Sequence, residues 1–369
     1  MLWAIAVALA GLAAAETWTL VNFQPLGVDF LPLWTAGRMA WTNLGHVYDF
    51  AAVTRAQGWL LPNFHWMRPY AYPPTALLAL APFGALPFWP ALALWTALSF
   101  GVFLAAGQRL VRDQRILALA LMILSPAVVL AALAGQTVVL AAGLAALAVA
   151  ELERRPWLAG VLLALAAALK PQAALLAPVA LIACGGFETL AAAALAGAAL
   201  VAASVVCFGF ARWPEWLASL APFQAVVESI PRLMPGVITP YGAAHELGLT
   251  GAAALCWRAA FGLIGLGLVW RVFAKDRDPA TRLAALGAGS LLVAPYAMHY
   301  DGTLLVIPAV VLALRLDGPG WVRRLLALCV VCEVTVPDLG LAAVTAFAAL
   351  ACWELRPIRM GGREAVAPA

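Results

Sequence analysis

Apolar runs separated by short polar breaks make up most of this 369-residue chain. About 20 consecutive apolar residues are needed for one helix to cross a bilayer. Runs of nearly that length or more predict spanning helices at residues 2–21, 88–107, 116–134, 189–208 and 252–272. Shorter runs predict helices that are tilted, buried or re-entrant at residues 137–150, 157–169, 172–184, 283–297, 302–314, 325–336 and 339–353.

Three further segments do not fit the pattern of a simple span. The run at 75–85 is too short to cross and has prolines on both sides, which favours a re-entrant helix. Two polar segments, 22–73 and 209–251, interrupt the apolar pattern. The first is rich in Trp and Tyr, and its periodic apolar stretches predict short helices on the membrane face. These stretches lie near residues 33–39 and 51–60.

The composition excludes a soluble protein. The chain is 65% hydrophobic and 11% charged, with a mean hydropathy of +0.94. We therefore predict a single integral membrane domain over residues 1–369, with an all-α polytopic fold of about 11–13 transmembrane or re-entrant helices. The six cysteines lie in or beside apolar runs, so no disulfide framework is predicted. No nucleic-acid partner is expected.

The cations predict how the chain is oriented. Most of the 22 Lys and Arg residues fall in short loops that the helix pattern places on one side, including 109–115 and 271–282. The positive-inside rule assigns these loops to the cytoplasm. The long segments 22–73 and 209–251 are then both outer loops of a multi-pass protein in the cell (inner or plasma) membrane.

Lys170 stands between two apolar runs and directly before Pro171. A cation at membrane depth is costly, so it usually faces a cavity or a partner and marks a functional site. The proline favours a break between two short helices over a continuous span. We expect Lys170 to bind an anionic group near the membrane surface.

Asp29 is the first acid after the first predicted span. It has two interpretations. The carboxylate is either the N-cap of the helix that follows, or a general base that takes a hydroxyl proton.

Other polar residues at the outer ends of spans also have two interpretations. Arg38 is either a ligand for phosphate or a cation that extends to the lipid surface. Gln136 either binds a hydroxylated substrate or satisfies a helix end. His299 belongs to a polar group with Tyr300 and Asp301. The sequence favours a structural role at the membrane interface and a role in the active site equally.

Several familiar sites are missing from the sequence. There is no Gly-rich phosphate loop followed by Lys-Ser or Lys-Thr. The sequence Asp276-Arg277-Asp278 has the form of a nucleotide-sugar metal site, but it lies in a charged turn and is interpreted as solvated. The remaining histidines lack the spacing of metal ligands. We expect no metal and no cofactor.

The polar stretches, taken in order, resemble glycosyltransferase family 87, the polyprenol-phosphate-mannose-dependent mannosyltransferases with the membrane GT-C fold. The matching stretches are Val28-Asp29-Phe30, Trp34-Thr35-Ala36-Gly37-Arg38, Val47-Tyr48-Asp49, Tyr72-Pro73-Pro74, Ala81-Pro82, Leu86-Pro87, Gly135-Gln136, Ala159-Gly160, Leu169-Lys170-Pro171-Gln172, Pro295 and His299-Tyr300. The chain departs from the pattern in its short N-terminus and at residues 185–188, where a basic turn is more usual.

The resemblance implies an inverting transfer of a hexose such as mannose on the outer face. The donor would be a polyprenyl-phosphate-linked sugar, and the acceptor a lipid-linked or cell-envelope glycan. Asp29 corresponds to the catalytic carboxylate and His299 to its active-site partner. Cations at the leaving phosphate would stabilise its growing charge. We expect Lys170, Arg38, Gln136, Tyr72 and Tyr300 to bind the donor phosphate or sugar.

A transporter or flippase of lipid-linked intermediates is the alternative, because broken helices and an intramembrane lysine also fit that class. The sequence shows no convincing internal repeat, and its polar residues cluster on one side. A purely structural subunit would leave Asp29, Lys170 and His299 without a role.

The predicted orientation can be tested by cysteine labelling. Single cysteines placed in 22–73 and 209–251 should react with a membrane-impermeant maleimide added from outside. Cysteines in 109–115 should react only after the membrane is permeabilised. The opposite accessibility would place the polar cluster on the cytoplasmic side.

Overall fold

The computed structural model describes residues 2–23, 25–58, 67–111, 113–230, 234–315 and 344–345. Within these ranges the chain is helical, with no β-strand, and the predicted all-α polytopic fold is confirmed. The helices predicted at 325–336 and 339–353 lie outside the described residues, apart from 344–345.

The helices of the first half are α1 (Leu2–Phe23), α2 (Phe30–Thr42), η1 (Leu44–His46), α3 (Phe50–Gln57), α4 (Pro74–Gly84), α5 (Phe88–Leu110), α6 (Arg115–Ile123), α7 (Pro126–Ala134), α8 (Val138–Glu151) and α9 (Pro156–Leu169). Those of the second half are η2 (Pro171–Ala173), α10 (Ala177–Ala183), α11 (Phe187–Phe208), α12 (Arg212–Glu228), η3 (Met234–Gly236), α13 (Pro240–Glu246), α14 (Gly251–Lys275), α15 (Pro279–Val293), η4 (His299–Gly302) and α16 (Thr303–Leu314).

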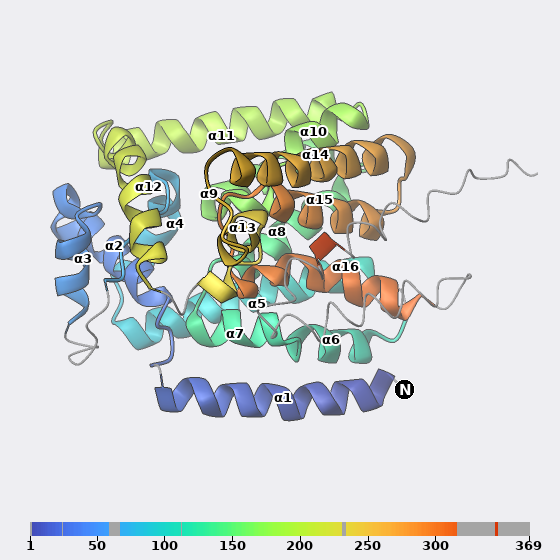
Figure 1. Cartoon of the computed structure of the whole chain (residues 1–369), viewed down its shortest axis with the longest axis horizontal. Coiled ribbons are helices and arrows are strands. Elements are labelled where there is room, and N and C mark those ends of the chain that lie inside the picture. The colour runs from blue at the N-terminus through green and yellow to red at the C-terminus, as the bar shows by residue number, and fades with distance from the viewer. Residues whose placement is uncertain are drawn as a thin grey trace, which may run out of the picture.

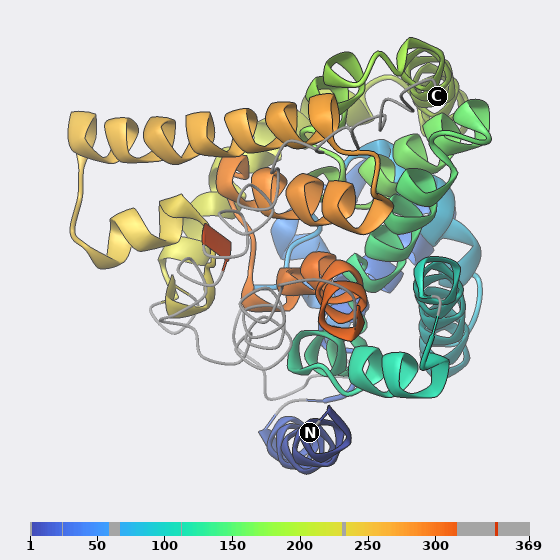
Figure 2. The ribbon, with the colours of Figure 1, turned by 90° about the vertical axis from the view of Figure 1, so that its right-hand side faces the viewer.

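Long helices surround a core of shorter ones. In Figure 1, α1 and α11 run along the long axis of the molecule, whereas α14 lies across the view in Figure 2. Nearly every residue of α8, α15 and α16 is buried, so these helices form the centre. Helices α5, α11 and α14 are long and apolar enough to cross a membrane, and the bent pair α6–α7 is a fourth candidate among the described residues.

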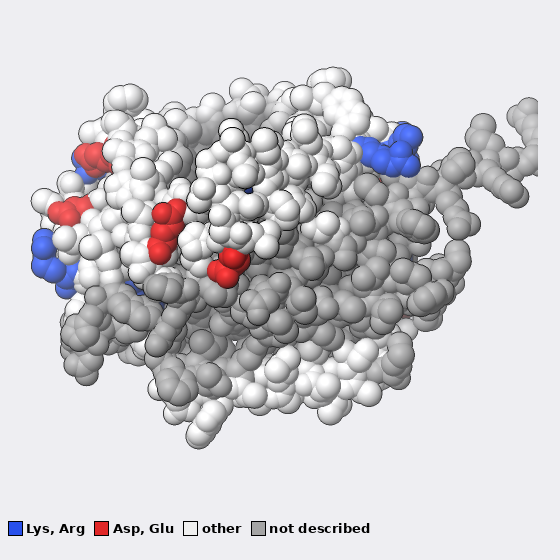
Figure 3. Space-filling view, viewed as in Figure 1, with Lys and Arg blue, Asp and Glu red and all other residues white. Residues whose placement is uncertain are grey.

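The outer helices expose apolar side chains that suit lipid. On α11, Leu195 and Val206 are exposed, and on α14 so are Leu255 and Leu263. Contiguous exposed apolar surface of this kind marks an interaction site such as a membrane. On the face in Figure 3, acidic side chains lie in the half that contains α12 and α13, and a basic group lies beside the far end of α14.

Three of the predicted segments differ from the observed helices. The predicted helix 116–134 is α6 and α7, which meet at an angle of 57° where Pro126 begins the second helix. The predicted helix 172–184 is divided between η2 and α10. The polar segment 209–251 contains helices that the hydropathy pattern did not predict, α12 and α13, because it is not continuously apolar.

Helices α2 and α4 pack with their backbones in contact. A Cβ atom at Gly84 would lie 2.1 Å from the backbone nitrogen of Arg38, and one at Gly37 would lie 2.4 Å from the carbonyl oxygen of Leu80. Both distances are shorter than a Cβ can tolerate, so this crossing requires glycine on each helix. The contact fixes the middle of α2.

We predict that Gly84→Ala destabilises the protein by about 1–3 kcal/mol, the usual cost of overpacking. The measurement is the thermal unfolding temperature in detergent. Gly197→Ala is the matched control, because its Cβ would meet nothing within 4 Å and alanine favours a helix. Equal unfolding temperatures for the two variants would show that the α2–α4 crossing is not tight.

Candidate functional site

The C-terminal end of α7 fixes the position of Asp29. Gly135 has a φ of 75°, and the backbone N–H groups of Gly135 and Gln136 donate to the carbonyls of Ala132 and Ala131. This is a Schellman ending, which leaves the last two carbonyls of the helix without partners inside α7. Gly27 N–H donates to the first of these, at residue 133 (2.8 Å), and Asp29 N–H donates to the second, at residue 134 (2.9 Å).

The Asp29 carboxylate does not cap α2. Asp29 occupies the N-cap position, but its side chain makes no capping hydrogen bond. Instead, Oδ1 accepts from Arg68 at 3.1 Å and Oδ2 accepts from Gln136 Nε2 at 2.8 Å. The side chain remains 29% exposed. These contacts disfavour the N-cap interpretation, since a capping carboxylate would accept from the first turn of its own helix.

Arg68 is itself held in place by the first polar segment. Its guanidinium also donates to the carbonyl of Val28, its backbone N–H donates to Thr54 Oγ1, and its carbonyl accepts from Gln57. Burial lowers the pKa of Arg68, and the charge of Asp29 partly offsets that effect. Arginine nevertheless stays protonated at neutral pH, so Asp29 has a permanent cation beside it.

The predicted break at Lys170 is confirmed. α9 ends at Leu169, and Lys170 is extended before the short turn η2. The Lys170 Nζ atom lies 2.5 Å from Asp301 Oδ1, and their side chains are only 6% and 2% exposed. The same Nζ lies 5.1 Å from the centroid of the Tyr300 ring. Lys170 therefore faces the protein interior, as expected, but its charge already has a partner.

Asp301 connects this ion pair to the turn that carries His299. Its second oxygen, Oδ2, accepts from the backbone N–H of Met298 at 2.9 Å. On the other side of the turn, Ile238 N–H donates to the Ala297 carbonyl at 2.9 Å. A Cβ at Gly236 would lie 2.8 Å from His299 Nδ1. The second polar segment thus packs directly on the His299 turn.

Six of the seven predicted residues belong to one group. Asp29 interacts electrostatically with Lys170, His299 and Tyr300. Gln136 joins through its hydrogen bond to Asp29. The remaining member is Tyr72, which interacts with Lys170 and whose hydroxyl lies 3.2 Å from Thr137 Oγ1. Residues distant in sequence are thus assembled from the first loop, α7, α9 and the turn before α16.

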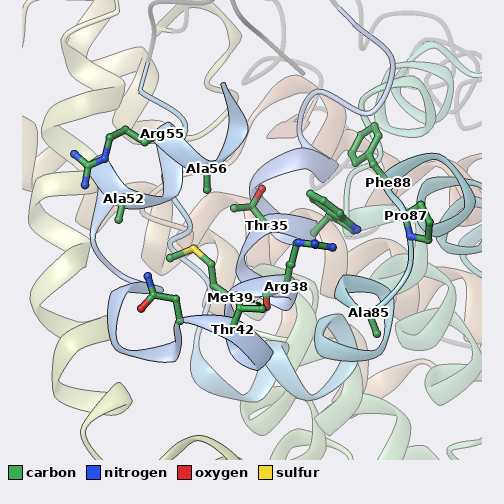
Figure 4. A pocket seen from close by; sticks show the side chains of 12 residues that line it. Thr35, Arg38, Met39, Thr42, Ala52, Arg55, Ala56, Ala85, Pro87 and Phe88 are labelled. Atoms are coloured by element: carbon green, nitrogen blue, oxygen red, sulfur yellow. Dashed lines mark hydrogen bonds between the residues drawn. The ribbon is translucent and has the colours of Figure 1, made fainter. Parts of the chain in front are cut away.

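Arg38 is the exception. It lies on the exposed side of α2, with its guanidinium 5.5 Å from the centroid of the Trp34 ring. It borders a cavity that none of the six grouped residues lines, shown in Figure 4. The expectation that Arg38 shares one site with Lys170 has no support in this arrangement.

Three members of the group were not among the predicted site residues. Arg68 looked like one of several cations in a long loop, and only the fold brings it to Asp29. Asp301 stands two residues after His299, and its place in the same polar stretch was the available signal. Tyr296 interacts electrostatically with Asp29 and Asp301, and its carbonyl accepts from Gln172 Nε2 at 3.1 Å.

The acids at residues 276 and 278 have structural roles. Asp278 caps α15 by accepting from Thr281 N–H at 2.8 Å, and it pairs with Arg315 at 2.5 Å. The Asp276 carboxylate accepts from Asp278 N–H at 2.8 Å, and the Asp276 backbone carbonyl accepts from Arg282. These contacts place both acids in a turn, as expected, but the Asp278 carboxylate is paired and only 27% exposed rather than solvated. Among the described residues, no group of three His, Cys, Asp or Glu side chains is placed to hold a metal ion.

Comparison with known proteins gives one match. The family model described as Glycosyltransferase family 87 matches residues 70–295, more than half of the chain. The matched range includes Tyr72, Gln136 and Lys170, whereas Asp29 and His299 lie outside it. No curated protein and no solved structure matches the chain significantly.

The buried ion pair generates a prediction about stability. Lys170→Met should leave the Asp301 carboxylate buried without its cation, at a cost of about 3–5 kcal/mol. The double variant Lys170→Met/Asp301→Asn should recover most of this loss. Thermal unfolding in detergent measures both.

Arg155→Met is the control, because Arg155 is 70% exposed and lies 4.0 Å from its partner, and exposed pairs contribute little. A double variant as unstable as the single one would show that Lys170 stabilises the fold by some means other than its charge.

Proposed function

The chain belongs to glycosyltransferase family 87 and is a membrane glycosyltransferase, and from this premise we propose its donor, acceptor and mechanism. The donor is a polyprenyl-phosphate-linked hexose, such as mannose. The acceptor is a lipid-linked or cell-envelope glycan. The transfer takes place on the extracytoplasmic side of the cell membrane, within a GT-C-like helical frame, and inverts the anomeric centre.

The observation that carries the proposal is the environment of Asp29. A carboxylate at an N-cap position that does not cap its helix, and that is oriented through both oxygens by Arg68 and Gln136, is positioned for another purpose. Each carboxylate oxygen has two lone pairs, so a third donor can still bind. The exposed part of the side chain is where an acceptor hydroxyl would approach.

In the proposed step, Asp29 accepts the proton of the acceptor hydroxyl as that oxygen forms a bond to the anomeric carbon. The bond from the anomeric carbon to the phosphate oxygen breaks, and its electron pair stays on the phosphate. The products are the glycosylated acceptor and polyprenyl phosphate. Attack from the face opposite the leaving group accounts for inversion, and a base that is held in position typically contributes about two to four orders of magnitude to the rate.

The leaving phosphate gains negative charge when it changes from a diester to a monoester. Positive groups placed in advance stabilise that charge. Lys170 has three N–H donors, so it can bind a phosphate oxygen while it keeps Asp301. We assign the phosphate to Lys170 and to His299, which lies on the turn that Asp301 joins to Lys170, with Tyr72 and Tyr300 beside the sugar.

The cation distribution supports the outer location, and a donor on that side would explain why the sequence shows no nucleotide site. Sugar nucleotides are cytoplasmic, whereas a lipid-phosphate sugar can serve as donor on the other side. A flippase remains the alternative function, but transport alone gives no use for a carboxylate oriented at both oxygens. Family membership also favours transfer over transport.

We predict that Asp29→Asn lowers turnover by about two to four orders of magnitude, because the amide keeps the shape but cannot take a proton. The measurement is transfer from a radiolabelled polyprenyl-phosphate-mannose donor, under conditions limited by chemistry. Donor binding and the unfolding temperature are recorded in parallel, since Arg68 loses its counter-charge.

Asp49→Asn is the matched control. Asp49 is an exposed N-cap whose side chain accepts from Ala52 N–H at 3.0 Å, and asparagine caps about as well as aspartate. It should retain wild-type turnover. If Asp29→Asn kept more than about a tenth of the activity, Asp29 would have a structural role.

A further inference from the structure

The cavity that Arg38 borders lies apart from the Asp29 group. It is an open cavity of about 790 Å³, lined by α2, α3 and the connection between α4 and α5 (Figure 4). Its size exceeds what a single small ion would fill, and it falls within the range of cavities that bind organic ligands.

The charge of the cavity wall is positive. Arg38 comes from α2 and Arg55 from α3, and both are exposed cations. No acidic residue is among the described residues that line the cavity. A lining with two guanidinium groups and no carboxylate favours an anion, and arginine binds phosphate oxygens with paired N–H groups.

A buried hydroxyl in the same wall also lacks a partner. Thr35 is 2% exposed, and its Oγ1 makes no hydrogen bond within the described part of the chain. The Thr35 side chain lines the cavity between the two arginine-bearing helices (Figure 4). Buried polar atoms in native proteins are normally hydrogen-bonded, so this oxygen is available to a bound ligand.

Apart from Thr42 and Asn43, the remaining lining residues are apolar, and the aromatic part of the wall is held in place by specific contacts. The indole N–H of Trp34 donates to the Leu86 carbonyl at 3.0 Å, and its ring lies edge-on to Phe88, with ring centroids 5.6 Å apart. Met39 adds a third apolar side chain. A ligand that matches this wall has an anionic head and a hydrocarbon portion.

We propose that this cavity binds the phosphate group of a lipid phosphate other than the reacting sugar donor. Arg38 follows Asp29 by nine residues on one helix, which places their backbones about 13 Å apart. Arg38 is therefore poorly placed to bind the phosphate that leaves beside Asp29. The binding of a lipid phosphate is inferred from the cavity alone, whereas its distinction from the sugar donor rests on the proposed function.

The test follows amide hydrogen exchange of residues 43–57 in the full-length protein in neutral detergent. The probes are citronellyl phosphate, citronellol, inorganic phosphate and dioleoyl phosphatidylglycerol. Citronellyl phosphate should slow exchange in α3 in a saturable way, whereas citronellol and inorganic phosphate should not at the same concentration. Protection by phosphatidylglycerol as well would identify bilayer phospholipid as a source; protection by the isoprenyl phosphate alone would identify a polyprenyl lipid.

Variants assign the contacts. Arg38→Gln/Arg55→Gln should raise the Kd for citronellyl phosphate by about tenfold or more, because two charge-assisted contacts are lost. Thr35→Val, which keeps the shape of the side chain, should raise it by a smaller factor. Arg258→Gln is the control, since Arg258 is an exposed cation outside the cavity and its loss should change nothing.

Any of the following results would overturn the proposal. Equal protection by citronellol would make the cavity a plain apolar site, and equal protection by inorganic phosphate would make it a site for the free ion. An unchanged Kd in the double arginine variant, or an equal loss in Arg258→Gln, would show that the two arginines do not bind the head group. The absence of protection of residues 43–57 by every probe would also contradict the proposal.

Discussion

The organisation of the site depends on the burial of one charge. An ammonium group removed from water is stable only when a carboxylate or another strong partner lies against it. Lys170 obtains this from Asp301, and the contact joins the break after α9 to the turn before α16. Because the second oxygen of Asp301 accepts from the backbone of the same turn, the ion pair also sets where His299 lies.

Asp29 is positioned by a different principle. Hydrogen bonds from residues 27 and 29 complete the carbonyl end of α7, so the N-terminal segment acts as an external cap for a helix a hundred residues away. The same ending turns Gln136 toward the carboxylate. The helix end and the acid are thus one structural unit, in which the backbone supplies the geometry and the side chains supply the charge.

Hydropathy and proline positions predicted much of the helical frame. Hydropathy failed to predict helices in which polar and apolar residues mix, as in α12. It also failed to predict where a proline bends an apolar run, as at Pro126. The cost of a buried cation was enough to predict that Lys170 would face a partner at a helix break. The identity of the partner was not predictable, because Asp301 reaches it only through the packing of α16 and η4.

The hydrogen-bond partners of Asp29 also could not be predicted from the sequence. Its two interpretations were inseparable in the sequence, since an aspartate before a helix has the same spacing in either role. The structure separates them through Arg68, whose position results from contacts with Thr54 and Gln57 that no local pattern encodes. Arg38 shows the converse: it is close to Asp29 in sequence, yet the helix between them carries it to a cavity that Asp29 does not line.

The glycine contact between α2 and α4 has a consequence for substrate size. Gly37 and Gly84 hold the two backbones together near the Arg38 end, so α2 behaves as a rigid rod with Asp29 at its other end. The distance between Asp29 and Arg38 is therefore fixed by the helix. A single acceptor that placed its hydroxyl at the acid and its phosphate at the arginine would have to match a length of about 13 Å, set by the rise of the helix.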